Sequence, residues 1–248
     1  MLIVMFAFTM TVMGLVGVVI ERFAYRPLRN APRLAPLITA IGVSFILQNI
    51  IQVTFSNSPV NVPRVIEAQA GATVQLPEFA VANFQVTATP VTFSYAHIFI
   101  IVLAVSLMVA LQLFVGRTRL GRAMRSTAID REAAQLMGVD INTTIALTFF
   151  IGSALAGAAG VAWALNYGTT KFDIGFQAGL KSFTAAVLGG IGNTTGAALG
   201  GFLIAFIEVF SSQLGYSRWS EAIVFSILIL VLVFRPTGIL GQRLAERA

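Results

Sequence analysis

Seven apolar segments recur along the chain, and they constrain its fold more than any other feature. They are residues Leu2–Ile20, Leu34–Phe55, Ala96–Val115, Thr143–Leu165, Ser182–Ile191, Thr195–Phe210 and Ser220–Phe234. About 20 helical residues cross the roughly 30 Å hydrocarbon core of a bilayer, and shorter helices fit where protein surrounds them. Only 10% of residues are charged, against about 25% in soluble domains. The sequence therefore predicts an all-α polytopic membrane protein, with one transmembrane domain over residues 1–248.

Arginine is concentrated in three stretches that flank the apolar segments, residues 21–33, 117–131 and 235–247. Residues 56–95 hold a single basic residue, Arg64, and their Pro, Thr and Val content favours short strands and turns. Loops rich in Lys and Arg stay in the cytoplasm. We therefore expect residues 56–95 to be an external loop and the C-terminus to be cytoplasmic.

The fifth and sixth apolar segments are separated by a glycine-rich turn. A cytoplasmic C-terminus requires an even number of crossings after the second arginine stretch, so this pair must enter and leave the membrane from one side. Two short helices or one re-entrant hairpin satisfy that requirement, because irregular backbone at membrane depth is tolerated where protein or water satisfies it. The turn contains Gly189, Gly190, Gly192 and Asn193.

Several functional classes are disfavoured. The chain has no cysteine and one histidine, so neither disulfides nor a thiolate metal site is expected. No phosphate-binding lysine loop, nucleophile elbow or paired-carboxylate pattern occurs, so we predict no catalytic residue, no metal and no cofactor in this chain. The net charge of +6 is carried by residues that flank apolar runs, which favours membrane lipid over nucleic acid as the partner.

The loop over residues 116–142 predicts a docking element at the cytoplasmic face. Asp130 can cap a short helix and Gly138 can end it, which gives about two turns from Arg131 to Met137. Its expected docking residues are Arg125, Asp130, Arg131, Glu132, Ala133, Ala134, Leu136, Met137 and Gly138. The arginines offer charge and the last two side chains before Gly138 offer an apolar face. An amphipathic stretch lying on anionic lipid is the alternative.

Polar residues inside the apolar segments are candidates for a translocation path, because polar groups in lipid are costly. The candidates are Gln48, Asn49, Gly189, Gly190, Gly192 and Asn193. Hydrogen bonds between helices, or a cap on the glycine turn, are the structural alternatives. Glu208 favours a structural ion pair over a role in passage, and His97 favours packing at the outer interface. Stripes of small residues predict close helix packing.

The whole chain resembles a known family. The segments that carry the resemblance are Phe23-Ala-Tyr-Arg-Pro-Leu-Arg29, Ala31-Pro-Arg-Leu-Ala-Pro-Leu37, Ile41-Gly-Val-Ser44, Glu132-Ala-Ala with Gly138, Phe183-Thr-Ala-Ala-Val-Leu-Gly-Gly-Ile-Gly-Asn193 and Phe234-Arg-Pro-Thr-Gly-Ile-Leu-Gly241. They are similar to the LivH-type permeases of branched-chain amino acid ABC importers. Glu132-Ala-Ala followed by Gly138 resembles the loop through which such permeases touch their ATPases.

The resemblance implies a type II ABC importer permease-like helical bundle with glycine-rich short or re-entrant helices, in the bacterial inner membrane. It also implies three kinds of protein partner: a LivM-like second permease subunit, two cytoplasmic ATPase subunits that hold ATP and Mg, and a periplasmic substrate-binding protein. Family members carry further helices before the position of Met1, so we expect the chain to lack the family's N-terminal helices.

The sequence leaves three alternatives to a branched-chain amino acid importer. A urea or short-chain amide permease of the same superfamily shares the loop and tail motifs. An ATPase-independent secondary transporter or channel would need ion-coupling or selectivity residues within the membrane. A non-transporting scaffold is the third.

Overall fold

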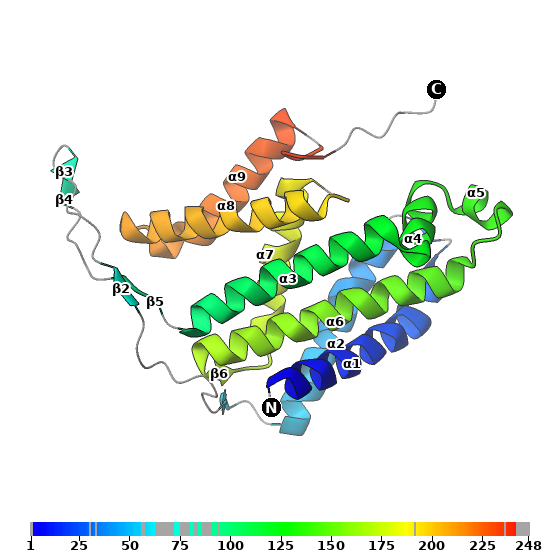
Figure 1. Cartoon of the computed structure of the whole chain (residues 1–248), viewed down its shortest axis with the longest axis horizontal. Coiled ribbons are helices and arrows are strands. Elements are labelled where there is room, and N and C mark those ends of the chain that lie inside the picture. The colour runs from blue at the N-terminus through cyan, green and yellow to red at the C-terminus, as the bar shows by residue number, and fades with distance from the viewer. Residues whose placement is uncertain are drawn as a thin grey trace. The chain divides into compact units, whose positions relative to one another are not determined.

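The computed structural model describes residues 2–29, 31–32, 34–55, 58–62, 72–74, 80–81, 84–85, 91–93, 95–190, 192–235 and 237–241 (Figure 1). The chain divides into two compact units, Met1–Phe172 and Asp173–Ala248. Helix dominates both, and among the described residues six helices are long and apolar enough to cross a membrane. The predicted all-α polytopic class is confirmed.

The first unit contains most of the helices. They are α1 (Leu2–Ile20), the π-helical turn η1 (Glu21–Tyr25), the 3-10 turn η2 (Arg26–Leu28), α2 (Leu34–Phe55), α3 (Tyr95–Arg117), α4 (Arg119–Ile129), α5 (Arg131–Leu136) and α6 (Ile141–Tyr167). The bounds of α1 and α2 are those expected from the apolar runs. Those of α3 and α6 extend by one to two residues at each end.

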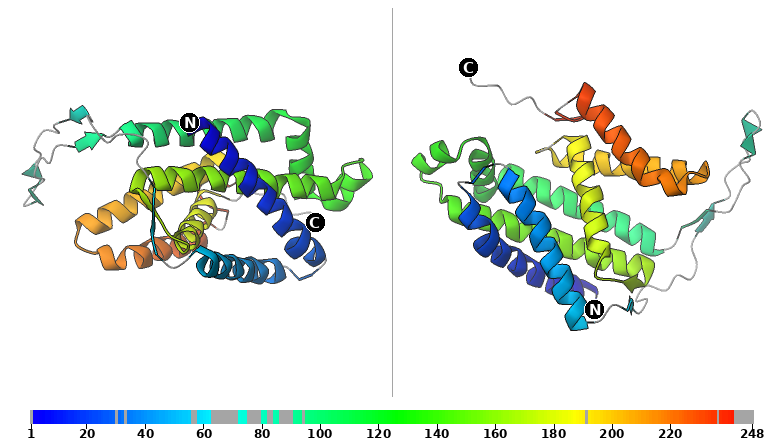
Figure 2. Two further views of the ribbon diagram at one scale, coloured as in Figure 1. Left: turned by 90° about the horizontal axis from the view of Figure 1, so that it is seen from below. Right: turned by 180° about the vertical axis from the view of Figure 1, so that it is seen from behind.

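Helix α1 lies against α6, and small residues make the approach possible (Figure 2). A Cβ atom added at Gly17 would collide with the Ser153 side chain, and one at Gly157 would lie 3.0 Å from Met13. The close approach is thus made by Ser153 and Gly157, which lie beside the predicted stripe of Gly152, Ala156 and Gly160; a Cβ atom added at Gly152 or Gly160 would meet nothing within 4 Å. Phe6, Ala158 and Leu165 form the buried core of this contact, and apolar side chains of α3 pack on it.

Short strands occur within residues 56–95, as the sequence predicts, and a further strand, which the sequence did not predict, follows α6. They are β1 (Val60–Asn61), β2 (Ala72–Val74), β3 (Ala80–Val81), β4 (Phe84–Gln85), β5 (Val91–Phe93) and β6 (Thr169–Thr170). β2 pairs with β5 and β3 with β4, both antiparallel, within the expected external loop over residues 56–95; much of that loop lies outside the described residues. β1 pairs with β6, with Val60 opposite Thr170. This pairing joins the segment that follows α2 to the segment that follows α6.

The second unit consists of α7 (Ile174–Gly189), α8 (Thr194–Gln213), the 3-10 turn η3 (Ser217–Trp219) and α9 (Ser220–Phe234). The expected segment Ser182–Ile191 is corrected here: α7 begins at Ile174, because glycine and polar residues lower the hydropathy of its first half without interrupting the helix. Its 16 residues make it shorter than the six candidate spans. Ala185, Leu188, Ile204 and Val224 form the core of this unit.

Candidate functional site

Helix α5 has the caps that the sequence predicts. The Asp130 side chain accepts a hydrogen bond from the Ala133 N–H at 3.0 Å, which satisfies a backbone donor at the helix start. Gly138 has a φ of +83°, and the Val139 N–H returns to the Ala134 carbonyl at 3.0 Å. A left-handed residue at this position is the usual end of a helix. The short helix expected between Asp130 and Gly138 is therefore present.

The docking residues on α5 divide into one inward position and a free outer surface. Ala134 is 4% exposed and packs inward, whereas Leu136 is 88% and Met137 84% exposed. Arg131, Glu132, Ala133 and Gly138 are exposed as well. Two large apolar side chains on such a short element leave a surface that a partner protein can cover.

Helix α4, which precedes α5, was not anticipated as a separate element. Thr118 Oγ1 accepts a hydrogen bond from the Gly121 N–H at 3.0 Å, and Gly121 itself lies against the Val115 carbonyl. Arg125 Nη1 donates to the Val115 carbonyl at 2.8 Å and to the Gly116 carbonyl at 3.3 Å. Arg125 thus covers unpaired carbonyls at the C-terminal end of α3, where a cation is favourable. The sequence signals were Thr118 as an N-cap and the amphipathic pattern that follows.

A hydrogen-bond network that sequence reasoning missed joins the end of α1 to the start of α6. The Glu21 side chain is 4% exposed, and it pairs with Arg29. A second guanidinium nitrogen of Arg29 donates to Asn142 Oδ1, 113 residues later in the chain. Arg29 also shares the wall of a cavity of about 480 Å³ with Arg131 of α5. The network therefore lies beside the docking helix.

Asp140 caps α6 between the docking helix and this network. Its carboxylate accepts hydrogen bonds from the Thr143 hydroxyl at 2.6 Å and from the Asn142 N–H at 2.9 Å. The Thr143 hydroxyl and N–H, with smaller contributions from the Asn142 N–H and the charge of Arg26, hold the pKa of Asp140 below its ordinary value. Asp140 is therefore a negatively charged cap at neutral pH.

The expected path residues on α2 make hydrogen bonds inside their own helix. Gln48 is half-buried and its amide donates to Ser44 Oγ at 3.2 Å, while exposed Asn49 donates to the Phe45 carbonyl at 2.8 Å. Hydrogen bonds to another helix were the structural alternative, and within the described residues neither side chain forms one. Their place on a path stays a prediction.

The expected path residues in the glycine turn are packed tightly. A Cβ atom at Gly189 would overlap the Gly196 carbonyl oxygen, and Gly190 has a φ of +111° against the backbone of Gly241. Asn193 Oδ1 accepts from the Gly196 N–H at 3.1 Å, and its amide donates to the Leu240 carbonyl at 3.1 Å.

Gly192, with a φ of +91°, has open space around its Cα. The geometry of the turn is that of a helix cap and a close helix crossing.

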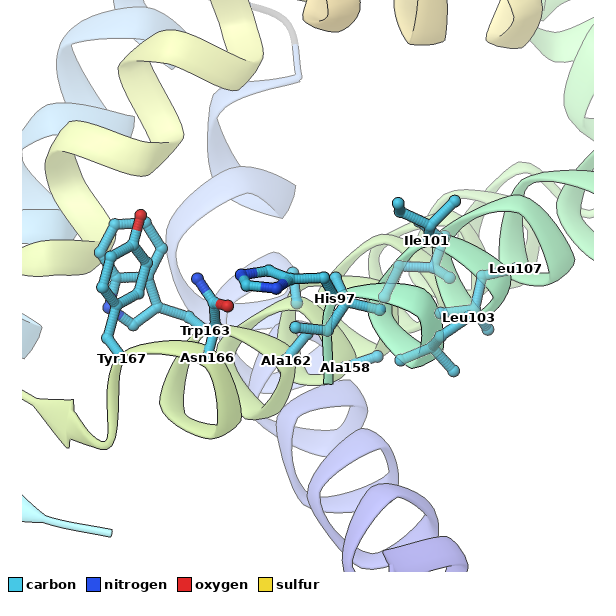
Figure 3. Close-up of a pocket in the computed structure, with 13 residues that line it drawn as sticks. His97, Ile101, Leu103, Leu107, Ala158, Ala162, Trp163, Asn166 and Tyr167 are labelled. Atoms are coloured by element: carbon cyan, nitrogen blue, oxygen red, sulfur yellow. The ribbon is translucent and has the colours of Figure 1, made fainter. Parts of the chain in front are cut away.

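An apolar cavity of about 540 Å³ lies between α3 and α6. Figure 3 shows imidazole, indole, amide and phenol groups at one end of it, contributed by His97, Trp163, Asn166 and Tyr167. The Trp163 and Tyr167 rings lie 4.3 Å apart, and the rest of the wall is aliphatic. The cavity can hold an aliphatic group, with hydrogen-bonding groups at one end. The sequence placed His97 at the outer interface, but nothing in it showed that residues 97 and 166 share a wall.

Within the described residues, no group of three or more His, Asp or Glu side chains is arranged to hold a metal ion. The expected ion pair of Glu208 is present: Lys181 Nζ lies 2.6 Å from its Oε1, between α7 and α8.

Known proteins are similar to this chain over most of its length. Residues 1–232 match the family described as branched-chain amino acid transport system / permease component. The high-affinity branched-chain amino acid transport system permease protein BraD of Pseudomonas aeruginosa is 42% identical over 250 residues, which cover all of this chain and 77% of that protein.

The corresponding permease protein LivH of Escherichia coli K12 is 41% identical over 92% of this chain and 70% of its own. A probable branched-chain amino acid transport permease protein of Methanocaldococcus jannaschii is 28% identical over 59% of this chain and 48% of its own. No solved structure matches.

Proposed function

The chain belongs to the family of branched-chain amino acid transport system permease components, and from that premise we propose that it carries branched-chain or related amino acids across the inner membrane by alternating access. As a multi-pass permease component it is not itself an enzyme, because ATP is hydrolysed in separate subunits. The proposed complex contains this chain, a LivM-like second permease, two cytoplasmic ATPases that bind ATP and Mg, and a periplasmic binding protein.

The observation that carries the proposal is the exposed surface of α5. It presents Leu136, Met137 and Glu132 on a capped helix whose only buried docking residue is Ala134. In the proposed orientation, with the C-terminus in the cytoplasm, this surface faces the compartment where an ATPase hydrolyses ATP. A cleft in an ATPase can cover the two apolar side chains, as hot-spot residues at interfaces are covered.

The network beside α5 supports a route for the motion into the membrane. A shift of α5 acts on Asp140 and Asn142 through the short connection after Gly138, and Asn142 is bonded to Arg29. Arg29 is bonded in turn to the buried Glu21 at the end of α1. We propose that ATPase closure moves α1 relative to the membrane through these contacts.

The docking proposal is tested by co-purification of this chain with its ATPase after Glu132→Lys or Gly138→Arg. Both changes place a cation on the α5 surface, and we expect association to fall by about tenfold or more, as for the loss of an interface hot spot. Undiminished association would contradict the docking role.

The chain offers matched controls for these two changes. Gly215 has a φ of +85° and open space around it, like Gly138, so Gly215→Arg imposes the same backbone strain away from α5. Glu221 is an exposed carboxylate in the first turn of α9, so Glu221→Lys matches Glu132→Lys in charge. Association should survive both controls.

A further inference from the structure

The ion pair between α7 and α8 is costly for a structural contact. Both partners lie in packed helices of the second unit, with Lys181 Nζ 2.6 Å from Glu208 Oε1, and Glu208 belongs to α8, one of the candidate membrane spans. Removing two charges from water is expensive, and apolar side chains of similar size hold helices together as well or better. Charged residues within membrane segments mark substrate or ion pathways by default.

The pair is accessible although the contact beneath it is closed. The side chain of Lys181 is 39% exposed and that of Glu208 is 27% exposed. One helical turn further along the same contact, Ala185 is 8% and Ile204 5% exposed. The pair therefore lies at the open end of a sealed helix crossing.

The position of the pair along both helices sets its depth. Lys181 lies about 10 Å from the start of α7 and Glu208 about 8 Å from the end of α8, at 1.5 Å per helical residue. Both of these ends lie opposite the glycine turn, and α7 begins shortly after β6 at the end of α6. In the proposed orientation the pair is reached from the external side.

An amino acid is chemically matched to such a pair. It carries one carboxylate and one ammonium group on the same carbon, so Lys181 can take the carboxylate while Glu208 takes the ammonium. Each charge keeps an opposite partner throughout the exchange, and no unpaired charge is left in a low-dielectric region. Neither a neutral amide nor an inorganic ion satisfies both partners at once.

We propose that Lys181 and Glu208 form a substrate site in which the ion pair opens to bind the zwitterionic headgroup of an amino acid, through a lysine–carboxylate and a glutamate–ammonium contact. This inference rests on the proposed function and names the recognition of the substrate class. The site recognises the headgroup of the substrate amino acid and not its aliphatic side chain, so the binding protein discriminates among amino acids.

The deciding variant is Lys181→Met combined with Glu208→Gln in the complete importer, reconstituted in liposomes with its binding protein. The double change removes both charges, so no unpaired charge destabilises the α7–α8 contact. We expect the complex to assemble and to hydrolyse ATP as the wild type does, while leucine uptake falls by about tenfold or more with the loss of two charge-assisted contacts. Glu221→Gln, at the exposed carboxylate of α9, is the matched control and should leave uptake unchanged.

Leucine uptake at the wild-type rate in the double variant would overturn the proposal. If the double variant does not assemble, the exchanged pair Lys181→Glu with Glu208→Lys decides, because it keeps the attraction and reverses its polarity. Assembly without leucine uptake supports the site. Assembly with full uptake, or no assembly of either variant, shows that the pair is structural.

The wild-type complex is assayed with leucine and with urea. Urea uptake without leucine uptake would overturn the proposed function itself, whereas a defect limited to the Lys181 and Glu208 variants concerns the site alone.

Discussion

The docking region of the first unit and the α7–α8 contact of the second unit are stabilised in opposite ways. The docking region depends on side chains: Asp130, Arg125 and Asp140 each satisfy backbone groups, and Arg29 joins two distant segments. The α7–α8 contact depends on the absence of side chains, because Gly189 and Gly196 bring two backbones together. The first arrangement can shift by exchanging hydrogen bonds, whereas the second cannot move without losing its packing.

This difference suits a permease that is driven from one end. Capped short helices with exposed apolar side chains can follow a partner, while a glycine-packed crossing transmits displacement as a rigid element. Interfaces and packed cores change between discrete arrangements and do not deform continuously. We therefore expect substitutions at the close-packed glycines of the α7–α8 contact to remove folded protein, and those in the docking region to alter coupling or stability in smaller steps.

The largest effect is expected from Gly189→Val. A Cβ atom at this position overlaps the Gly196 carbonyl oxygen, which is backbone and cannot rotate away. Overpacking lowers folding stability by about 1–3 kcal/mol where neighbouring side chains can move aside, and by more where they cannot. The variant should be lost from the membrane fraction, or elute as aggregate in size-exclusion chromatography in detergent.

Gly152→Val in α6 is its control. Nothing lies within 4 Å of the added Cβ atom in this chain, so folded yield should stay near that of the wild type. Equal yields of Gly189→Val and Gly152→Val would contradict the claim that the α7–α8 contact is rigid.

A smaller effect is expected from Glu21→Gln, which leaves Arg29 without its carboxylate. Breaking a buried ion pair costs about 3–5 kcal/mol, and about 2 is expected here because the side chain of Arg29 is 18% exposed. Thermal unfolding in detergent, followed by tryptophan fluorescence, measures this loss.

Replacing both partners, Glu21→Leu with Arg29→Leu, should recover about half of that stability. A deficit of about 1 kcal/mol should remain, because the hydrogen bond from Arg29 to Asn142 is also removed. A double variant less stable than Glu21→Gln alone would show that the network is not held by charge pairing.

The two regions also differ in how far the sequence predicts them. Local sequence features predict local structure. Asp130 and Gly138 predict the ends of α5, and the apolar runs predict α1, α2 and α9 at their observed bounds. The glycines after α7 predict a turn and the small residues of α8 predict close packing, though not that Gly189 meets Gly196 or that Gly238 meets Gly190.

Contacts between distant segments leave no local signal. Asn142 is an ordinary polar residue at the start of a helix, and nothing marks it as the partner of Arg29. Likewise, Glu208 indicates an ion pair without indicating Lys181 as the partner. The α7 start at Ile174 was missed for another reason, since glycine and polar residues lower the hydropathy of its first half.

The smallest effect is expected at Asp140, the exposed cap of α6. Its pKa in the folded chain lies below the ordinary value of 3.8, chiefly because the Thr143 hydroxyl and N–H donate to the carboxylate. A carboxyl whose pKa is lowered by folding contributes its stabilisation in full above 3.8, and loses it only as the pH falls through the lowered value.

Asp140→Asn keeps an acceptor for the Asn142 and Thr143 N–H groups, so at neutral pH its unfolding temperature should be close to that of the wild type. Asp140→Ala should unfold at a measurably lower temperature, because the cap is gone. Thermal scans of the three proteins at neutral and acidic pH separate charge from hydrogen bonding: if Asp140→Asn is as unstable as Asp140→Ala, then the negative charge, and not the cap geometry, holds the docking region to α6.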